Sequence, residues 1–346
     1  MSETLAIVEK VISPPVVVEV GGNLPAVQFD YDLLVGKWIE FMKDYSGVES
    51  AQSERAYRGA IRQLYKYFNE QGVNIFAATE ADVKTWLKYL KETKKPATVQ
   101  MYLVAVRLFY AFLTKEKVIA ENPCKAGGEA LKAGVKVKRN VHKRDYLSQA
   151  QAQKLIANMP AGTEKELRDR AIVALMITAG LRCCEVSRAL YEDLRTAGDY
   201  HVLYLQGKGH TEKDDYIKVA PVVVEMIRDY LKVRFNGGEP KDSDYLFVST
   251  SRNHAKLDRD DELSTQAIRA IAKAAFKAIG FDDSRHTAHS LRHTAATLML
   301  RSGETLENVQ SVLRHENIQT TLVYARALER EKNNAELKVS NLIFGQ

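Results

Sequence analysis

One stretch near the carboxyl end constrains this chain more than any other: HSLRHTAATLMLRSGETLENVQSVLRHENIQTTLVY, residues 289–324. It predicts a first helix in which Leu291, Ala295 and Leu298 recur at helical spacing. Gly303, a residue free to adopt left-handed backbone angles, is expected to end this helix. Polar and reactive residues lie at the helix edges rather than among the apolar positions. The stretch therefore predicts a helical unit with reactive side chains at the edges of its helices.

Two further short helices are expected in the same stretch. Thr305 can cap a second helix, in which Val309 and Val312 are expected to face inward. Asn317 can cap a third helix. His315 then lies in the link between the second and third helices.

The polar residues of this stretch indicate attack by a tyrosine hydroxyl on a phosphodiester. His289 and Arg292 are three residues apart and leave one face of a helix, and Tyr324 follows His315 by nine residues. A phenol has a pKa of about 10, so Tyr324 needs help, usually from a histidine, to lose its proton. The transition state spreads negative charge over non-bridging oxygens, which the guanidinium fork of Arg292 can bind two at a time.

Three segments, in the right order, resemble the boxes of the tyrosine recombinases, also called phage-type integrases: TAGLRCCEVSRAL, HSLRHTAATLML and LRHENIQTTLVYAR. The resemblance is close over about residues 146–330 and looser over a helical first half. It implies a mainly α fold with a small antiparallel β-sheet, in which a helical SAM-like core-binding domain and a catalytic domain form a two-domain, C-shaped clamp. It also implies these catalytic residues: Arg182, Lys208, His289, Arg292, His315 and Tyr324, with Glu185 as a supporting carboxylate.

The chemistry that the resemblance implies needs no metal and no cofactor. Tyr324 attacks the scissile phosphate and forms a 3′-phosphotyrosyl bond, while His289 manages the tyrosine proton. Arg182, Arg292 and His315 stabilise the phosphorane. Because the covalent bond preserves the phosphodiester energy, the 5′ hydroxyl of a second strand can reverse the attack. The expected partners are double-stranded DNA with specific recombination sites and a homotetramer that joins two duplexes, in the cytoplasm.

The resemblance implies a catalytic lysine in a turn between two strands, and Lys208 is assigned to that position. A hairpin is predicted from His201–Gln206 and Tyr216–Val219, joined by GKGHTEKDD. A lysine between glycines at such a tip can reach the minor groove and protonate a departing 5′ oxygen, provided that its pKa is lowered from about 10.4. Lys208 fits this position. Lys213, in the same long and acidic turn, is the alternative, and a solvated turn lysine is the simplest one.

Two of these sites also have simpler explanations. Arg182 follows a strongly apolar helix and needs an anionic partner, which Glu185 alone could supply. His289 and His293 are four apart and could bind zinc with another histidine, but Arg292 between them would repel a dication, and no supporting cysteine is present. No metal is therefore expected. A type IB topoisomerase-like enzyme and a catalytically silent DNA-binding relative remain alternatives to a recombinase of integration, excision or dimer resolution.

The first half of the chain predicts four helices, Tyr31–Tyr45, Ser53–Gln71, Glu80–Glu92 and Thr98–Lys115. The second and third each combine an apolar seam with a basic stripe, formed by Arg55, Arg58, Arg62 and Lys66 and by Lys84 and Lys88. We expect these stripes to lack acidic partners, which favours phosphate binding over an ordinary solvated face.

The expected organisation is a flexible arm at 1–28, the core-binding domain at 29–122, a basic linker at 123–145, the catalytic domain at 146–330 and a tail at 331–346. Pro123 is expected to end the last helix of the core-binding domain. The linker cations Lys136, Lys138, Arg139, Lys143 and Arg144 are expected to follow a phosphate backbone.

Composition supports this organisation without proving it. The formal charge of +6 over 346 residues is compatible with nucleic acid, and three cysteines offer no disulfide framework. No run is expected to reach the roughly 20 apolar residues of a membrane span. Leu342, Ile343 and Phe344 near the end of the tail are costly to expose, which favours docking on a neighbouring protomer, although docking within the same chain is equally allowed.

Overall fold

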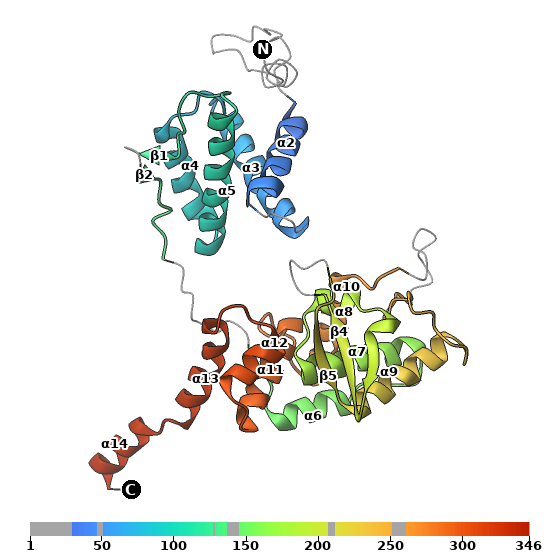
Figure 1. The fold of residues 1–346 in the computed structure, drawn as a ribbon. Helices are drawn as coiled ribbons and strands as arrows, with labels where there is room; N and C mark the ends of the chain where they lie inside the picture. The colour runs from blue at the N-terminus through green and yellow to red at the C-terminus, as the bar shows by residue number, and fades with distance from the viewer. Residues whose placement is uncertain are drawn as a thin grey trace. The chain divides into compact units, whose positions relative to one another are not determined.

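The computed structural model of the protein describes residues 30–46, 51–126, 129–136, 145–206, 212–250 and 261–345. The chain divides into two compact units, Met1–Arg139 and Asn140–Gln346. Figure 1 shows both, with the first unit almost entirely helical and the second built from helices around a small sheet. The predicted mainly α fold with a small antiparallel sheet is confirmed.

The first unit is a helical bundle, as predicted. Its elements are α2 (Tyr31–Ser46), α3 (Ala51–Glu70), α4 (Glu80–Thr93), α5 (Pro96–Lys115), β1 (Lys125–Ala126) and β2 (Glu129–Ala130). The apolar positions Ile61, Leu64 and Phe68 of α3 are buried against Trp38 and Phe109 in one core. Burial of these spaced apolar side chains is what holds the amphipathic helices together.

The end of this unit differs from the expected linker. Helix α5 ends at Lys115, as the predicted segment Thr98–Lys115 does, so Pro123 does not end it, and Lys117 has a left-handed φ of 56°. Cys124 and Leu131 are buried in the core of the first unit, and the short β1–β2 hairpin lies between them. The start of the expected linker is therefore part of the folded unit, because its apolar residues find a core to join.

Helix α5 also corrects the expectation about membranes. By length and composition it is apolar enough to cross one, with a mean hydropathy of 1.4. However, Val99, Val106, Phe109 and Leu113 are among its eight fully or almost fully buried residues. These side chains make the core of the first unit, which explains the apolar composition of the helix.

The second unit continues with these elements: α6 (Gln149–Ala157), α7 (Glu164–Ala179), α8 (Cys183–Arg188), the 3₁₀ turn η1 (Tyr191–Asp193), β3 (Leu194–Ala197), β4 (Tyr200–Leu205), β5 (Asp215–Val219), α9 (Pro221–Arg234), α10 (Thr265–Ala278), α11 (Ala288–Arg301), α12 (Leu306–Leu313), α13 (Gln319–Lys332) and α14 (Ala335–Phe344). Helix α7 is the centre, packed against α9, α10 and α11. It begins at Glu164, where Thr163 and Glu166 form a capping box.

The sheet has one more strand than the predicted hairpin. Strands β3, β4 and β5 form an antiparallel sheet in that order, with Leu203 opposite both Leu194 and Ile217. Leu203 and Leu205 are buried on the face toward the helices. Strand β3 has only four residues, and its middle two are exposed, so its alternation is too short to detect in the sequence.

Helices α11, α12 and α13 form the end of the second unit and follow the predicted order. Thr305 caps α12, and the side chain of Asn317 accepts a hydrogen bond from the amide of Gln319 at the start of α13. Val309 is buried as expected, but Val312 is exposed and Leu313 is buried in its place. These helices bring the reactive edge of α11 next to α13.

Candidate active site

The site begins at a left-handed glycine. Gly180 ends α7 with φ 65° and ψ 29°, where a side chain is strained. A Cβ built on it would lie 2.5 Å from Cδ2 of Leu313 and 3.8 Å from Cγ of Arg292. The backbone of the α7 end can therefore approach α11 and α12 closely only because residue 180 is glycine.

Arg292 connects these elements. It is 1% exposed, and its Nη1 donates to the carbonyl of Gly180 at 2.6 Å while Nη2 donates to the carbonyl of Leu313. Its Nε is buried and has no hydrogen-bond partner among the residues that the structure describes. Burial, together with the charges of Arg182 and Arg314, lowers the pKa of Arg292 to about 9, so the side chain is still cationic at neutral pH.

Arg182 lies two residues after Gly180, at the start of α8. Its backbone amide and its Nη1 donate to the carboxylate of Glu185 at 2.7 and 2.8 Å, and its Nη2 donates to the carbonyl of Arg314 at 3.1 Å. The side chain is 26% exposed, whereas that of Glu185 is fully buried. The predicted pairing of Arg182 with Glu185 is present, and it leaves part of the guanidinium accessible.

Sequence reasoning missed Arg314, which joins the same carboxylate. Its Nη2 lies 2.8 Å from Oε2 of Glu185 and its Nε 3.3 Å from Oε1. The available signal was its place at the end of α12, where a glycine is the common choice, directly before His315. Arg314 therefore belongs to the site together with Arg182 and Arg292.

Tyr324 is brought to these arginines by α13. It is 4% exposed and packs with Ala296, Val309 and Leu313 in a small core. Burial raises the pKa of Tyr324, and the charges of Arg292 and then Arg182 oppose that rise. The phenol, which lies in the same chain as both arginines, therefore shares their electrostatic environment, as the sequence predicted.

The histidines surround the phenol in a different order from the one expected. The ring of His293 lies edge-on to Tyr324 at 5.1 Å between centroids, and His289 lies edge-on to His293 at 4.6 Å. His289 is exposed and His293 is buried. His293, for which zinc binding was considered from the sequence, thus contacts both His289 and the tyrosine ring.

His315 also contacts Tyr324, with its ring nearly parallel to the phenol at 6.4 Å between centroids. Its Nδ1 is 2.9 Å from the hydroxyl of Thr321, which is fully buried. Burial and the charges of Arg292 and Arg182 lower the pKa of His315 to about 3. The imidazole is therefore neutral near pH 7, and it can bind phosphate only through a ring N–H.

The charges of the cluster do not balance. Arg182, Arg292 and Arg314 place three guanidinium groups around the single buried carboxylate of Glu185. A net positive charge in a largely buried cluster is stabilised by an anion that binds there. The described residues contain no group of three or more potential acidic, histidine or cysteine metal ligands.

The lysine predicted to be catalytic falls in a part of the chain without a structural description. Lys208 belongs to residues 207–211 between β4 and β5, which lie outside the described residues. The alternative, Lys213, is described, and its Nζ lies 2.7 Å from Oδ2 of the buried Asp193. That ion pair gives Lys213 a structural role and makes it a poorer candidate for a proton donor.

The basic stripes of the first unit are less free than expected. Arg55, Arg62, Lys66, Lys84 and Lys88 are exposed. However, acids one turn away pair with three stripe cations: Glu54 with Arg58 at 2.9 Å, Glu70 with Lys66 at 3.9 Å and Glu80 with Lys84. The expected absence of acidic partners is wrong, because i, i+4 acids were present in the sequence. Lys136 is exposed, and Lys138, Arg139, Lys143 and Arg144 lie outside the described residues.

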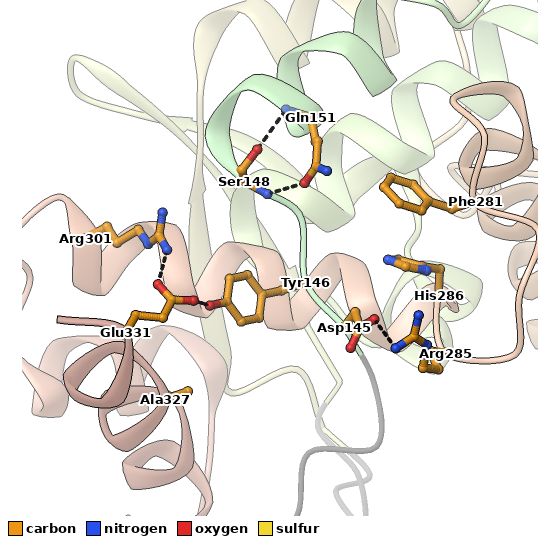
Figure 2. A pocket seen from close by; sticks show the side chains of 10 residues that line it. All are labelled: Asp145, Tyr146, Ser148, Gln151, Phe281, Arg285, His286, Arg301, Ala327 and Glu331. Carbon is orange, nitrogen blue, oxygen red and sulfur yellow. Dashed lines mark hydrogen bonds and ion pairs between the residues drawn. The ribbon is translucent and has the colours of Figure 1, made fainter. Parts of the chain in front are cut away.

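A separate pocket of about 480 Å³ lies where the second unit begins (Figure 2). The Tyr146 hydroxyl and Arg301 both donate to the carboxylate of Glu331, and Arg285 pairs with Asp145 at 3.1 Å. These contacts attach the end of α13 to α11 and to the residues before α6. The described lining of this pocket includes none of the proposed catalytic residues.

A buried phenol beside cationic guanidinium groups, carried on a helical domain with a small sheet, has the groups that transfer of a phosphodiester to a tyrosine would use. Sequence comparison agrees. Residues 145–331, more than half of the chain, match the phage integrase family, and residues 39–117 match its N-terminal SAM-like domain. The chain belongs to the phage integrase family, and it is a tyrosine recombinase, a site-specific DNA strand-exchange transesterase. The predicted family is confirmed.

Individual relatives are similar over most of their length. Tyrosine recombinase XerC of Listeria monocytogenes is 27% identical over 311 residues, 88% of this chain and 97% of that protein. Tyrosine recombinase XerD of Lacticaseibacillus casei is 28% identical over 295 residues, 84% and 92% of the two chains. The fold is similar to that of the XerH site-specific recombinase bound to a palindromic difH substrate, with a TM-score of 0.64 and 15% identity over 92% of this chain and 86% of that one. A lambda integrase dimer bound to a COC′ core site gives a TM-score of 0.57 and 16% identity over 84% and 94%.

Proposed function

We propose that this recombinase cuts and rejoins DNA through a 3′-phosphotyrosyl intermediate on Tyr324. The phenolic oxygen attacks the scissile phosphorus, a new P–O bond forms, and the bond to the 5′ oxygen breaks. The observation that carries this proposal is the burial of Tyr324 in one cluster with the cationic groups of Arg182 and Arg292. Reversal by another 5′ hydroxyl restores the phosphodiester without an external energy source.

Each residue of the cluster has a role in this proposal. Arg182 and Arg292 bind the non-bridging oxygens, whose charge grows in the transition state. Neutral His315 donates a hydrogen bond from its ring to one of these oxygens. His289, exposed at the edge of α11, accepts the tyrosine proton. The ring of His293 contacts both His289 and the phenol, and this transfer would use a water molecule or a small movement of α13.

The leaving 5′ oxygen takes its proton from Lys208 in the turn between β4 and β5. The support for this assignment is the position of the lysine between two glycines in the sequence that joins the antiparallel strands β4 and β5, and the ion pair of Lys213 with Asp193. Without a proton donor the departing oxygen would leave as an alkoxide, which is a poor leaving group.

Double-stranded DNA with specific recombination sites is the proposed substrate. The exposed cations Arg55, Arg62 and Lys88 of α3 and α4, with Lys136 and the other linker cations, are proposed to bind phosphates around the site. Such contacts position the protein and depend on salt, but they do not select sequence. The cations that already pair with acids, including Arg58, Lys66 and Lys84, contribute less.

Strand exchange is proposed to occur in a homotetramer that holds two duplexes in the cytoplasm. The support comes from α14, which extends away from its unit in Figure 1 and has no buried residue among its described side chains. Leu342, Ile343 and Phe344 are 85%, 68% and 73% exposed. Apolar side chains on a free helix are stabilised by a partner surface, and a second copy of the chain is the proposed one.

The test maps covalent cleavage on genomic DNA from the organism that encodes the chain. Protein–DNA adducts are trapped with detergent, and their end points are sequenced. We expect end points at one or a few sequences, and a nicked duplex with that sequence should trap the wild-type protein and leave the Tyr324→Phe variant free. Adducts that persist in Tyr324→Phe would remove the assignment. Scattered cleavage with relaxation of supercoils, but without joining of two duplexes, would point to topoisomerase-like action instead.

A further inference from the structure

Arg314 has a backbone conformation that its residue type does not favour. It ends α12 with φ 53° and ψ 52°, in the left-handed region, where glycine is the least strained residue. A non-glycine residue persists there only when its surroundings offset the strain. The side chain of Arg314 is therefore the place to look for a compensating interaction.

The compensating interaction is a two-point contact with a buried carboxylate. Arg314 Nη2 lies 2.8 Å from Oε2 of Glu185, Nε lies 3.3 Å from Oε1, and Nη1 donates to the carbonyl of Val312 at 2.6 Å. The side chain is 8% exposed and that of Glu185 is fully buried. A planar guanidinium fork matches a carboxylate in this way, which a lysine cannot do.

Arg314 also contacts Arg182 directly. Its backbone carbonyl accepts a hydrogen bond from Nη2 of Arg182 at 3.1 Å, while Glu185 accepts from Nη1 of the same side chain at 2.8 Å. Both terminal nitrogens of Arg182 are thus oriented by groups that Arg314 supplies or holds. Arg314 reaches the catalytic arginine from the opposite end of the cluster, 132 residues away.

The charged groups that face Glu185 are Arg182 from the start of α8, Arg314 from the α12–α13 turn and Arg292 from α11. Burial raises the pKa of Glu185, but the charge and hydrogen bond of Arg314, followed by the contacts of Arg182, outweigh burial and hold the pKa below its usual value. Without Arg314 the carboxylate would lose the partner that contributes most to its ionisation.

We propose that Arg314 is a positioning residue for strand cleavage: by fixing the Glu185 carboxylate and binding Arg182 through its own carbonyl, it sets the guanidinium of Arg182 for the scissile phosphate. This inference rests on the proposed function, because it concerns the same site. It adds a third arginine to the pair that the sequence indicated, in a role that acts through Arg182 rather than on the phosphate.

The experiment compares Arg314→Gly, Arg314→Lys and the wild-type protein on the nicked duplex with the mapped cleavage sequence. Arg314→Gly removes the guanidinium and at the same time relieves the backbone strain, so the fold should survive. Asn236→Gly is the matched control, because Asn236 is an exposed residue of the same unit with a similar φ of 51°, away from the site. Folding is checked by thermal unfolding and affinity by titration of the duplex.

We expect adduct formation by Arg314→Gly to be slower by about 10- to 100-fold, the effect of a small misplacement of a catalytic group. Affinity for the duplex should stay within about twofold of wild type. Arg314→Lys keeps the charge but not the fork, so it should be intermediate. Asn236→Gly should cleave at the wild-type rate.

The pH profile separates positioning from a general structural effect. The folded pKa of Glu185 is lowered, so the orienting carboxylate is present above that pKa and is lost as the pH falls through it. Arg314→Gly raises this pKa, and its cleavage rate should therefore fall at a higher pH than that of the wild type. Equal rates, or a slow variant with an unshifted pH profile, would overturn the proposal. If the wild-type protein forms no adduct on any mapped duplex, the proposed function itself fails.

Discussion

The Nδ1 atom of His315 lies 2.9 Å from the hydroxyl oxygen of Thr321, which precedes Tyr324 by about one turn of α13. When the hydroxyl donates to Nδ1, the proton of the neutral imidazole stays on Nε2, where it can donate to a phosphate oxygen. In that arrangement Thr321 would select the tautomer of His315 that can donate to phosphate, in a histidine that burial and the nearby arginines keep uncharged.

Replacing Thr321 by valine should therefore slow cleavage. Valine has nearly the same shape but no hydroxyl, and the loss should reach up to about 100-fold, the effect of removing one donor to a transition-state oxygen. Single-turnover adduct formation on the nicked duplex measures it. Thr321→Ser keeps the hydroxyl and should retain most of the rate; if serine and valine variants are equally slow, the hydroxyl is not the cause.

The pKa of His315 predicts a pH dependence of stability. Its folded pKa is about 3, below the unfolded value of about 6.5, so protonation favours the unfolded chain. Above about pH 6.5 His315 is neutral in both the folded and the unfolded chain and does not affect stability. As the pH drops from there toward 3, only the unfolded chain binds the proton, and the free energy of unfolding falls. Hydrogen exchange of α11 amides, compared at pH 7.5 and 5.0, should show a smaller loss of protection in His315→Gln than in wild type. His201→Gln, on β4, is the control and should lose as much as the wild type.

Gly180 should not tolerate even one added methyl group. Gly180→Ala combines left-handed strain with a contact of 2.5 Å to the fully buried Leu313. We expect the free energy of unfolding of the second unit to fall by about 2–4 kcal/mol. Gly198→Ala has a similar φ of 61° and open space around the new Cβ, so it should lose only about 1 kcal/mol. Equal losses in calorimetry would contradict the close packing at Gly180.

The two lysines of the β4–β5 segment can be separated by arginine, which keeps the charge but does not release a proton. Lys208→Arg should abolish adduct formation on an ordinary nicked duplex and recover it when the leaving 5′ oxygen is replaced by sulfur, since a thiolate leaves without protonation. Lys213→Arg keeps the ion pair with Asp193 and should cleave normally. The reverse pattern would move the role of proton donor to Lys213.

Assembly should depend on the end of α14. Ile343→Asp with Phe344→Asp places charge on an exposed apolar surface and should reduce complexes of two duplexes by about tenfold or more, while one duplex is still bound. Native gels with two labelled duplexes measure both species. Asn341→Asp adds a charge at an exposed polar position of the same helix and should assemble normally; undiminished pairing by the double variant would exclude α14 as the contact.

Much of this arrangement was predictable from the sequence. Three boxes in order predicted that Arg182, Arg292 and Tyr324 meet, and helical spacing located the helices to within a turn. The role of Arg314 could not be predicted, because it depends on a left-handed turn and on a carboxylate 129 residues away. The order of the histidines was also unpredictable, since residues four apart on one helix do not reveal which of them faces α13. The acids beside Arg58 and Lys84, in contrast, were visible in the sequence.

The contacts of Arg292 make the position of its guanidinium depend on how completely the second unit has folded. Its guanidinium is held by the carbonyl of Gly180, 112 residues away, and by that of Leu313, and both carbonyls are in place only when three helices have packed together. A partly folded chain therefore lacks the cluster in which Arg292 lies beside Tyr324. We therefore expect any cleavage of DNA at Tyr324 to require the complete fold of the second unit, so that a partly unfolded chain would not cut.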